Sequence, residues 1–136
     1  VSSLGAGTVL MTIAGFVLIY TVLLFIEGKL MLKAIRKAQK LVSAQALVVT
    51  RGRHGMAVAE GSRVDLIPEH GEKELVDVTG AGDTVGATLA MALGAGGNVD
   101  SAARLANIAG ALKVQKAGTA TVTVEELARE IELTET

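Results

Sequence analysis

Hydrophobic and polar positions divide this chain into two parts with different patterns. From Val9 to Ile26 the residues are uncharged, and apolar side chains fall on every face of a helix. A run of about 18 such residues is in the lower range for a membrane-spanning helix. Basic residues follow the run, namely Lys29, Lys33, Arg36, Lys37 and Lys40. The pattern predicts a spanning helix whose C-terminal side is cytoplasmic.

This apolar run has a second interpretation, because a buried core helix of a soluble domain can show the same composition. We favour membrane contact through residues 9–26. On that interpretation the whole chain is anchored in an inner membrane with its C-terminus inside, and the polar second part is cytoplasmic.

From about Ala38 the pattern changes to short apolar runs separated by glycine turns. We expect strands at 46–50, 56–60 and 63–67, an extended apolar segment at 75–78, and helices at 82–95, 101–115 and from 124 to about 133. Asn98 or Asp100 can cap the second of these helices, and Thr123 to Glu126 have the spacing of a capping box. Strands followed by helices predict α/β layers.

Composition narrows the classes of function. The apolar fraction is 50% but the aromatic fraction is only 2%, so we expect a core of Ala, Val, Leu and Ile. A net charge of -1 gives no support to a nucleic-acid partner. The chain has no Cys, which excludes disulfides and thiolate metal sites, and its two histidines, His54 and His70, lack ligand-like spacing.

The segment from Val76 to Thr84 carries the clearest chemical signal. A short apolar strand is predicted to enter the glycine turn Gly80-Ala81-Gly82, after which Asp83 begins a helix of small residues. Free N–H groups at a helix N-terminus hold anionic phosphate. A carboxylate beside that phosphate can accept the proton of an attacking hydroxyl. The turn therefore favours phosphoryl transfer to an alcohol, although Asp83 could equally be a simple helix cap.

The residues DVTGAGDT, followed by the helix ATLAMALGAG, resemble the C-terminal signature of the PfkB/ribokinase family of sugar kinases. The likeness extends from about Ala34 to Ile131 and includes LVVTRGRHGMAV and ARLANIAGALKVQKAGTATVTVEEL. It implies the C-terminal part of a ribokinase-like three-layer α/β/α fold in residues 37–136. The combination VDVTGAGDTV, ARLAN and GTATVT is most similar to the heptose-phosphate kinases of ADP-heptose and lipopolysaccharide synthesis.

The resemblance implies roles for the glycine turn. Asp83 would be the general base toward the sugar hydroxyl, and Gly80, Ala81 and Gly82 would form the anion hole. The phosphoryl donor would be ATP with Mg2+, and the acceptor a sugar phosphate.

Other implied roles concern the nucleotide. Thr50 and Gly52 would lie near the ATP phosphates, with Gly55 shaping the same turn. Asn107 would border the adenine, unless it is a surface amide, and Gly118 would lie in the following loop, which would also complete the site of a monovalent cation.

A monovalent cation, K+, is also implied beside the anion hole. Asp77 and the backbone of Thr79 would help to bind it, although Asp77 could instead form an Asx turn at a strand end. Lys113 and Lys116, like Arg51, Arg53 and His54, could touch phosphate, but we expect them in solvent.

Residues 1–36 resemble the last transmembrane helix of cytochrome bd ubiquinol oxidase subunit I. The haem ligands and quinol loop of that family are absent from them. We therefore divide the chain into an apolar helix at 1–36 and a partial nucleotide-binding domain at 37–136.

The function expected is ATP-dependent phosphorylation of D-glycero-β-D-manno-heptose 7-phosphate at O1. The sugar-binding half of the kinase family is not found before Ala34, so we expect a truncated or fused form with poor activity. A homo-oligomer is compatible with the sequence. The alternative is a non-catalytic membrane-anchored fragment, or an oxidase terminus with an unrelated kinase-derived tail.

Overall fold

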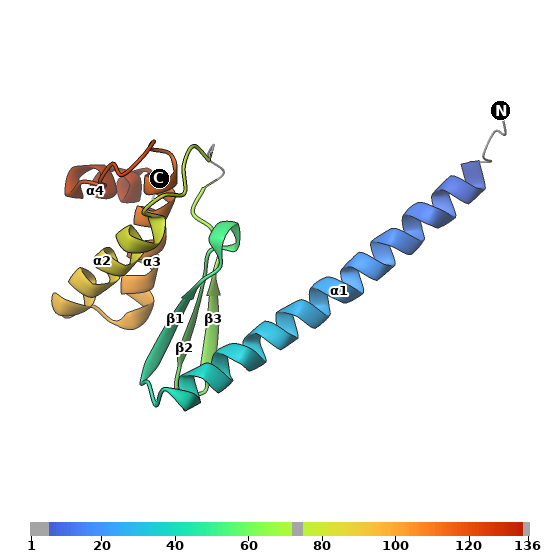
Figure 1. The fold of residues 1–136 in the computed structure, drawn as a ribbon, viewed down its shortest axis with the longest axis horizontal. Coiled ribbons are helices and arrows are strands. Elements are labelled where there is room, and N and C mark those ends of the chain that lie inside the picture. The colour runs from blue at the N-terminus through green and yellow to red at the C-terminus, as the bar shows by residue number, and fades with distance from the viewer. Residues whose placement is uncertain (1–5, 72–74, 135–136) are drawn as a thin grey trace.

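The computed structural model describes residues 6–71 and 75–134 of the chain. In order, its elements are α1 (Ala6–Leu41), β1 (Ala46–Thr50), a short 3-10 helix (Gly52–His54), β2 (Met56–Glu60), β3 (Arg63–Ile67), α2 (Ala81–Gly94), α3 (Val99–Val114) and α4 (Val124–Thr134). The three predicted strands are confirmed at the predicted residues, and the three predicted helices within a few residues of their ends. Figure 1 shows α1 leading away from a smaller body formed by the other elements.

The strands form one antiparallel sheet in the order β1-β2-β3. Thr50 pairs with Met56 across the first hairpin, and Met56 pairs with Ile67 across the second. Successive side chains of a strand point to opposite faces of its sheet. All of Met56–Ala59 in the central strand β2 are no more than 3% exposed, so both faces of the sheet are covered.

Helices cover the two faces of this sheet. On one face, Met56, Val58 and Ile67 pack against α2 and α3 through Val85, Ala103 and Ala106. On the other face, Ala57 and Ala59 pack against the end of α1, through Met31 and Ile35. Figure 1 shows these layers, with α2 and α3 on the side of the sheet opposite α1. The arrangement confirms the expected α/β fold class with helix, sheet and helix layers.

The first half of α1 has no such partner among the described residues. By length and composition, Val9–Leu41 is long and apolar enough to cross a membrane, and none of its most apolar stretch is buried. Leu10 and Met11 are 70% and 80% exposed. A core helix would be mostly covered, so this exposure does not support the soluble-core interpretation of the run.

One expected element is not a strand. Residues 75–78 have no regular secondary structure and do not join the sheet. The N–H groups of Val76 and Asp77 both donate to the Val114 carbonyl, at 2.8 and 3.0 Å. The prediction of a strand there was wrong because this segment pairs with the end of α3 rather than with another strand.

Candidate functional site

The glycine turn leads directly into α2, since Gly80 is the N-cap and Ala81 and Gly82 are the first two residues of the helix. Gly80 caps the helix with φ = 76°, in the left-handed region that favours glycine. Its carbonyl accepts the Thr84 N–H and the Thr84 hydroxyl, each at 3.0 Å. The N–H groups of Gly82 and Asp83 therefore lie in the first helical turn, where no carbonyl of the same helix can accept them. The Ala81 N–H instead donates to the Val78 carbonyl at 3.2 Å.

Asp83 is exposed in this first turn of α2. The positive end of the helix dipole stabilises negative charge at the same place, whether on a carboxylate or on a phosphoryl group. An exposed carboxylate directly after the free N–H groups can reach the hydroxyl of an incoming molecule. This is the arrangement that proton abstraction beside a held phosphate needs.

A cavity of about 200 Å³ brings together three separate parts of the chain. Six residues predicted from the sequence line it: Thr50, Gly52 and Gly55 from the β1–β2 turn, Ala81 and Gly82 from the glycine turn, and Asn107 from α3. Arg53, which is exposed, also lines the cavity. Five other predicted site residues are not among the lining residues: Asp77, Thr79, Gly80, Asp83 and Gly118.

The cavity also has an apolar wall that was not predicted from the sequence. Gly110, Ala111 and Val114 continue the α3 face on which Asn107 lies. Residues three, four and seven positions apart share one face of a helix, so the spacing from Asn107 could have identified them. Val85 of α2 packs closely against Gly110, where an added Cβ would lie 2.9 Å from the Val85 Cγ2, so glycine at 110 allows α2 and α3 to approach each other.

Gly55 determines the shape of the β1–β2 turn. Its φ is +76°, and a Cβ on this residue would lie 2.1 Å from the Ile67 carbonyl oxygen. No larger residue fits without moving the backbone after β3. The close approach brings the turn next to the segment at Pro68, where α3 is also attached.

Asn107 makes that attachment. Its side chain is 9% exposed, and its Nδ2 donates to the Pro68 carbonyl at 2.7 Å. The interpretation of Asn107 as a surface amide is therefore excluded. The bond ties α3 to the loop after β3 and places the amide at the cavity.

Asp77 connects the glycine turn to the loop after α3. Its Oδ1 accepts the Thr79 N–H at 2.9 Å and its Oδ2 accepts the Gly118 N–H at 2.8 Å. Hydrogen bonds from the side chain and backbone of Thr79, followed by the one from Gly118, lower the pKa of Asp77 to about 2. The Asx turn and the link to Gly118 are thus made by the same carboxylate.

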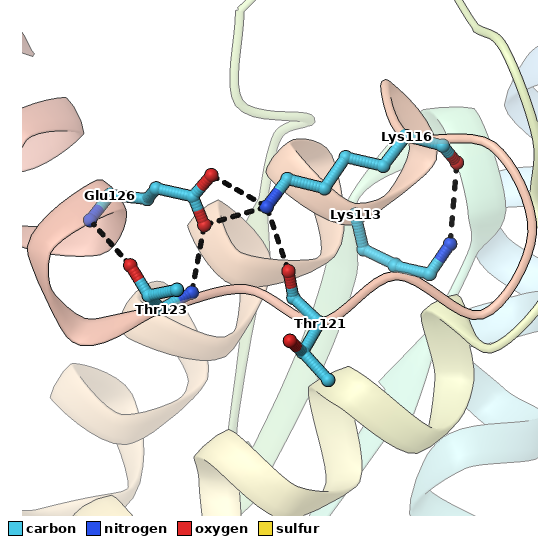
Figure 2. A network of polar contacts seen from close by, with 5 residues as sticks. All are labelled: Lys113, Lys116, Thr121, Thr123 and Glu126. Atoms are coloured by element: carbon cyan, nitrogen blue, oxygen red, sulfur yellow. Dashed lines mark hydrogen bonds and ion pairs between the residues drawn. The ribbon is translucent and has the colours of Figure 1, made fainter.

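The two lysines expected in solvent have other positions. Lys113 is 1% exposed, and its Nζ donates to the carbonyls of Gly118 at 2.8 Å and Lys116 at 3.4 Å. Lys116 extends the other way, to the Thr121 carbonyl at 2.7 Å and to Glu126 at 2.6 Å. Figure 2 shows both side chains, with Lys113 directed at the Lys116 carbonyl and Lys116 directed at Thr121 and Glu126. The expectation of a solvated side chain was wrong for Lys113, because the carbonyls of Lys116 and Gly118 surround its ammonium. Lys116 keeps 26% of its side chain exposed but is ion-paired with Glu126.

A sequence model of the pfkB family carbohydrate kinases matches residues 23–126. Among curated proteins, the chain is similar to the bifunctional protein HldE of Nitrobacter hamburgensis, with 48% identity over 99 residues. That alignment covers 72% of this chain and 20% of the relative. The HldE protein of Coxiella burnetii is 49% identical over 87 residues, 62% of this chain and 18% of the relative. The chain therefore spans about a fifth of the length of these relatives.

Solved structures share the fold. A ribokinase from Thermotoga maritima has a TM-score of 0.69 and 25% identity over 74% of this chain and 34% of its own. An Arabidopsis thaliana ribokinase complexed with ribose and ATP has a TM-score of 0.66 and 27% identity over 74% and 33%. Phosphofructokinase-2 from Escherichia coli in complex with potassium has a TM-score of 0.67 at 17% identity, over 78% and 34%.

Proposed function

We propose, since this chain belongs to the pfkB family of carbohydrate kinases, that its 37–136 segment transfers the terminal phosphoryl group of ATP to a sugar hydroxyl. The observation that carries the proposal is the cavity where the β1–β2 turn, the glycine turn and Asn107 meet. A similar solved ribokinase is a complex with ribose and ATP, which supports ATP as the donor.

Each part of the site would then have one role. Thr50, Gly52 and Arg53 lie where the ATP phosphates would approach, and the apolar face of α3 would take the base. Asp83 would accept the proton of the sugar hydroxyl. The sugar oxygen would attack the terminal phosphorus of ATP, and the bond between that phosphorus and the oxygen of the departing ADP would break. The N–H groups of Gly82 and Asp83 would stabilise the charge on the phosphoryl group in transfer.

Mg2+ would accompany ATP by binding its phosphates. Among residues 6–71 and 75–134, no three His, Asp or Glu side chains are grouped so as to hold a metal ion. The ion's ligands would accordingly come mainly from the nucleotide, as is usual for a magnesium ion bound with substrate phosphates.

The acceptor that we propose is a heptose 7-phosphate, phosphorylated at O1. The HldE-named relatives at 48% and 49% identity and the combination of VDVTGAGDTV, ARLAN and GTATVT support this substrate. Correct positioning of two reactants is worth roughly 7–11 kcal/mol of the barrier. Because the chain spans about a fifth of those relatives, we propose that residues 1–136 alone bind ATP but turn over slowly.

We also propose that residues 9–26 span an inner membrane, with the kinase-like part on the cytoplasmic side. The exposed, uncharged run and the basic residues after it support this orientation. The same exposure favours a second candidate function, a membrane-anchored piece without catalysis. ATP binding separates the two candidates, since only the kinase interpretation requires it.

The test uses the full chain in detergent micelles, with Asp83→Asn as the variant. Calorimetric titration should show weak ATP binding to both proteins, because Asp83 does not line the cavity. With heptose 7-phosphate, any phosphoryl transfer should fall about 10²–10⁴-fold in the variant, the usual contribution of a general base. Absence of ATP binding at millimolar concentration would refute the proposed site, and rapid turnover would refute the proposed slow turnover of residues 1–136 alone.

A further inference from the structure

Lys113 is the most deeply buried charged side chain in the part of the chain that the structure describes, with 1% of its surface exposed. An ammonium group so buried is costly unless oxygen atoms replace its water. Here the Gly118 carbonyl lies 2.8 Å and the Lys116 carbonyl 3.4 Å from Nζ. In Figure 2 the Lys113 side chain curls back toward the loop that follows its own helix.

The surroundings of Lys113 are the groups named above for a monovalent cation. The Gly118 carbonyl accepts from Lys113 Nζ, and the Gly118 N–H donates to Asp77. Asp77 also accepts the N–H of Thr79, which directly precedes the glycine turn. A Cβ built on Gly80 would lie 3.6 Å from the Lys113 Cε, so the lysine passes directly behind the turn. The positive charge of Lys113 also acts on the Asp77 carboxylate.

These contacts leave a poor fit for a separate K+ ion. Both oxygens of Asp77 already accept N–H groups, and the Gly118 carbonyl already accepts an ammonium. A second cation would lie close to the first and would be repelled by it. An ammonium group resembles K+ in charge, and its three N–H groups can bind carbonyl oxygens as the ion does.

We propose that the Lys113 ammonium takes the place of a monovalent cation beside the glycine turn, and orders that turn with a charge built into the chain. Lys113 is then a positioning residue, since it acts on Gly80 to Gly82 through Gly118 and Asp77. The consequence for catalysis rests on the proposed phosphoryl transfer. Whether Lys113 occupies the place of the cation does not depend on phosphoryl transfer, and it can be tested without ATP.

The experiment measures backbone amide NMR signals of the full chain in micelles, in choline chloride and then with increasing KCl at constant ionic strength. The signals of Thr79 and Gly118 in the unmodified protein should show no saturable change with K+. In Lys113→Ala the emptied space should admit the ion, so both signals should shift saturably with K+. The matched control is Lys116→Ala, which also removes an ammonium from this loop but one that faces Glu126, and it should show no saturable change.

Two results would overturn the inference. One is a saturable K+ response in the unmodified protein, because it would show that the place is open to the ion. The other is a folded Lys113→Ala that ignores K+, because Lys113 would then be purely structural. If Lys113→Ala does not fold in either salt, Lys113→Met, which keeps the alkyl stem, replaces it, and the unmodified protein still decides the first result. ATP binding plays no part in these readouts, so failure here is distinct from failure of the kinase proposal.

Discussion

Gly55 shows how one residue can determine the shape of the site. Alanine at this position would need a left-handed backbone, and its Cβ would meet the Ile67 carbonyl at 2.1 Å. Backbone strain of this kind costs about 1–3 kcal/mol by itself, and the clash adds to it. We expect Gly55→Ala to lower the free energy of unfolding by at least about 2 kcal/mol, measured by denaturant titration.

The control for this substitution is Gly61→Ala in the β2–β3 turn. Gly61 also has a positive φ, 57°, but a Cβ added there would meet no atom within 4 Å. Only the left-handed backbone cost of roughly 1–2 kcal/mol should appear. Equal losses in the two variants would show that the close contact at Gly55 has no energetic effect.

Asp77 should make stability depend on pH in the acid range. Its pKa falls from 3.8 to about 2 on folding, so its contribution is present above pH 3.8 and is lost as the pH falls toward 2. Asn at this position can accept a hydrogen bond but cannot ionise. The difference in unfolding midpoint between the protein and Asp77→Asn should be constant above about pH 5 and shrink below 3.8. A difference that does not change across this range would contradict the assigned hydrogen bonds.

At the scale of elements, helix caps matter because α3 carries both Asn107 and Lys113. Asn98 accepts the Ser101 N–H at 2.8 Å and begins α3 at Val99, so the expected choice between Asn98 and Asp100 is decided for Asn98. Asn98→Ala should cost about 1 kcal/mol of stability, measured by thermal unfolding. Ser101→Ala, which keeps the backbone donor, should have little effect, and a comparable loss there would argue against the cap.

The sequence pattern predicted most of the helices and strands after residue 45, but it failed at residues 75–78. The three strands and the capping box of Thr123 and Glu126 formed as predicted, since short strands, turns and caps depend on neighbouring residues. The segment 75–78 did not become a strand, because an apolar run of strand length needs a strand beside it. The N–H groups of Val76 and Asp77 instead donate to the carbonyl of Val114, more than thirty positions away in the chain.

At the scale of the whole molecule, α1 has two different surroundings. The C-terminal part of α1 covers one face of the sheet through Met31 and Ile35, while the apolar run at residues 9–26 is exposed. The full chain should therefore sediment on ultracentrifugation without detergent, and a chain lacking residues 1–26 should stay in the supernatant. A full chain that stays in the supernatant would contradict the membrane proposal.

A longer deletion serves as the comparison. Removal of residues 1–36 also takes Met31 and Ile35 away from Ala57 and Ala59. Burying one such large side chain is worth about 1.5–3 kcal/mol, so this chain should be less stable and should aggregate. If both deletions behave alike, the packing of α1 on the sheet contributes little.

The sequence by itself determined the local features: the apolar run, three strands, three helices, and the glycine turn with Asp83 at the start of a helix. These depend on periodicity and on neighbouring residues, which the order of amino acids contains directly. Only the tertiary structure decided that Asn107 bonds to Pro68 and that Lys113 is buried beside Gly118 and Asp77. Such contacts join residues that are distant in the chain, or depend on how a loop folds back, and a lysine on a helix looks solvated until the carbonyls that surround it are known.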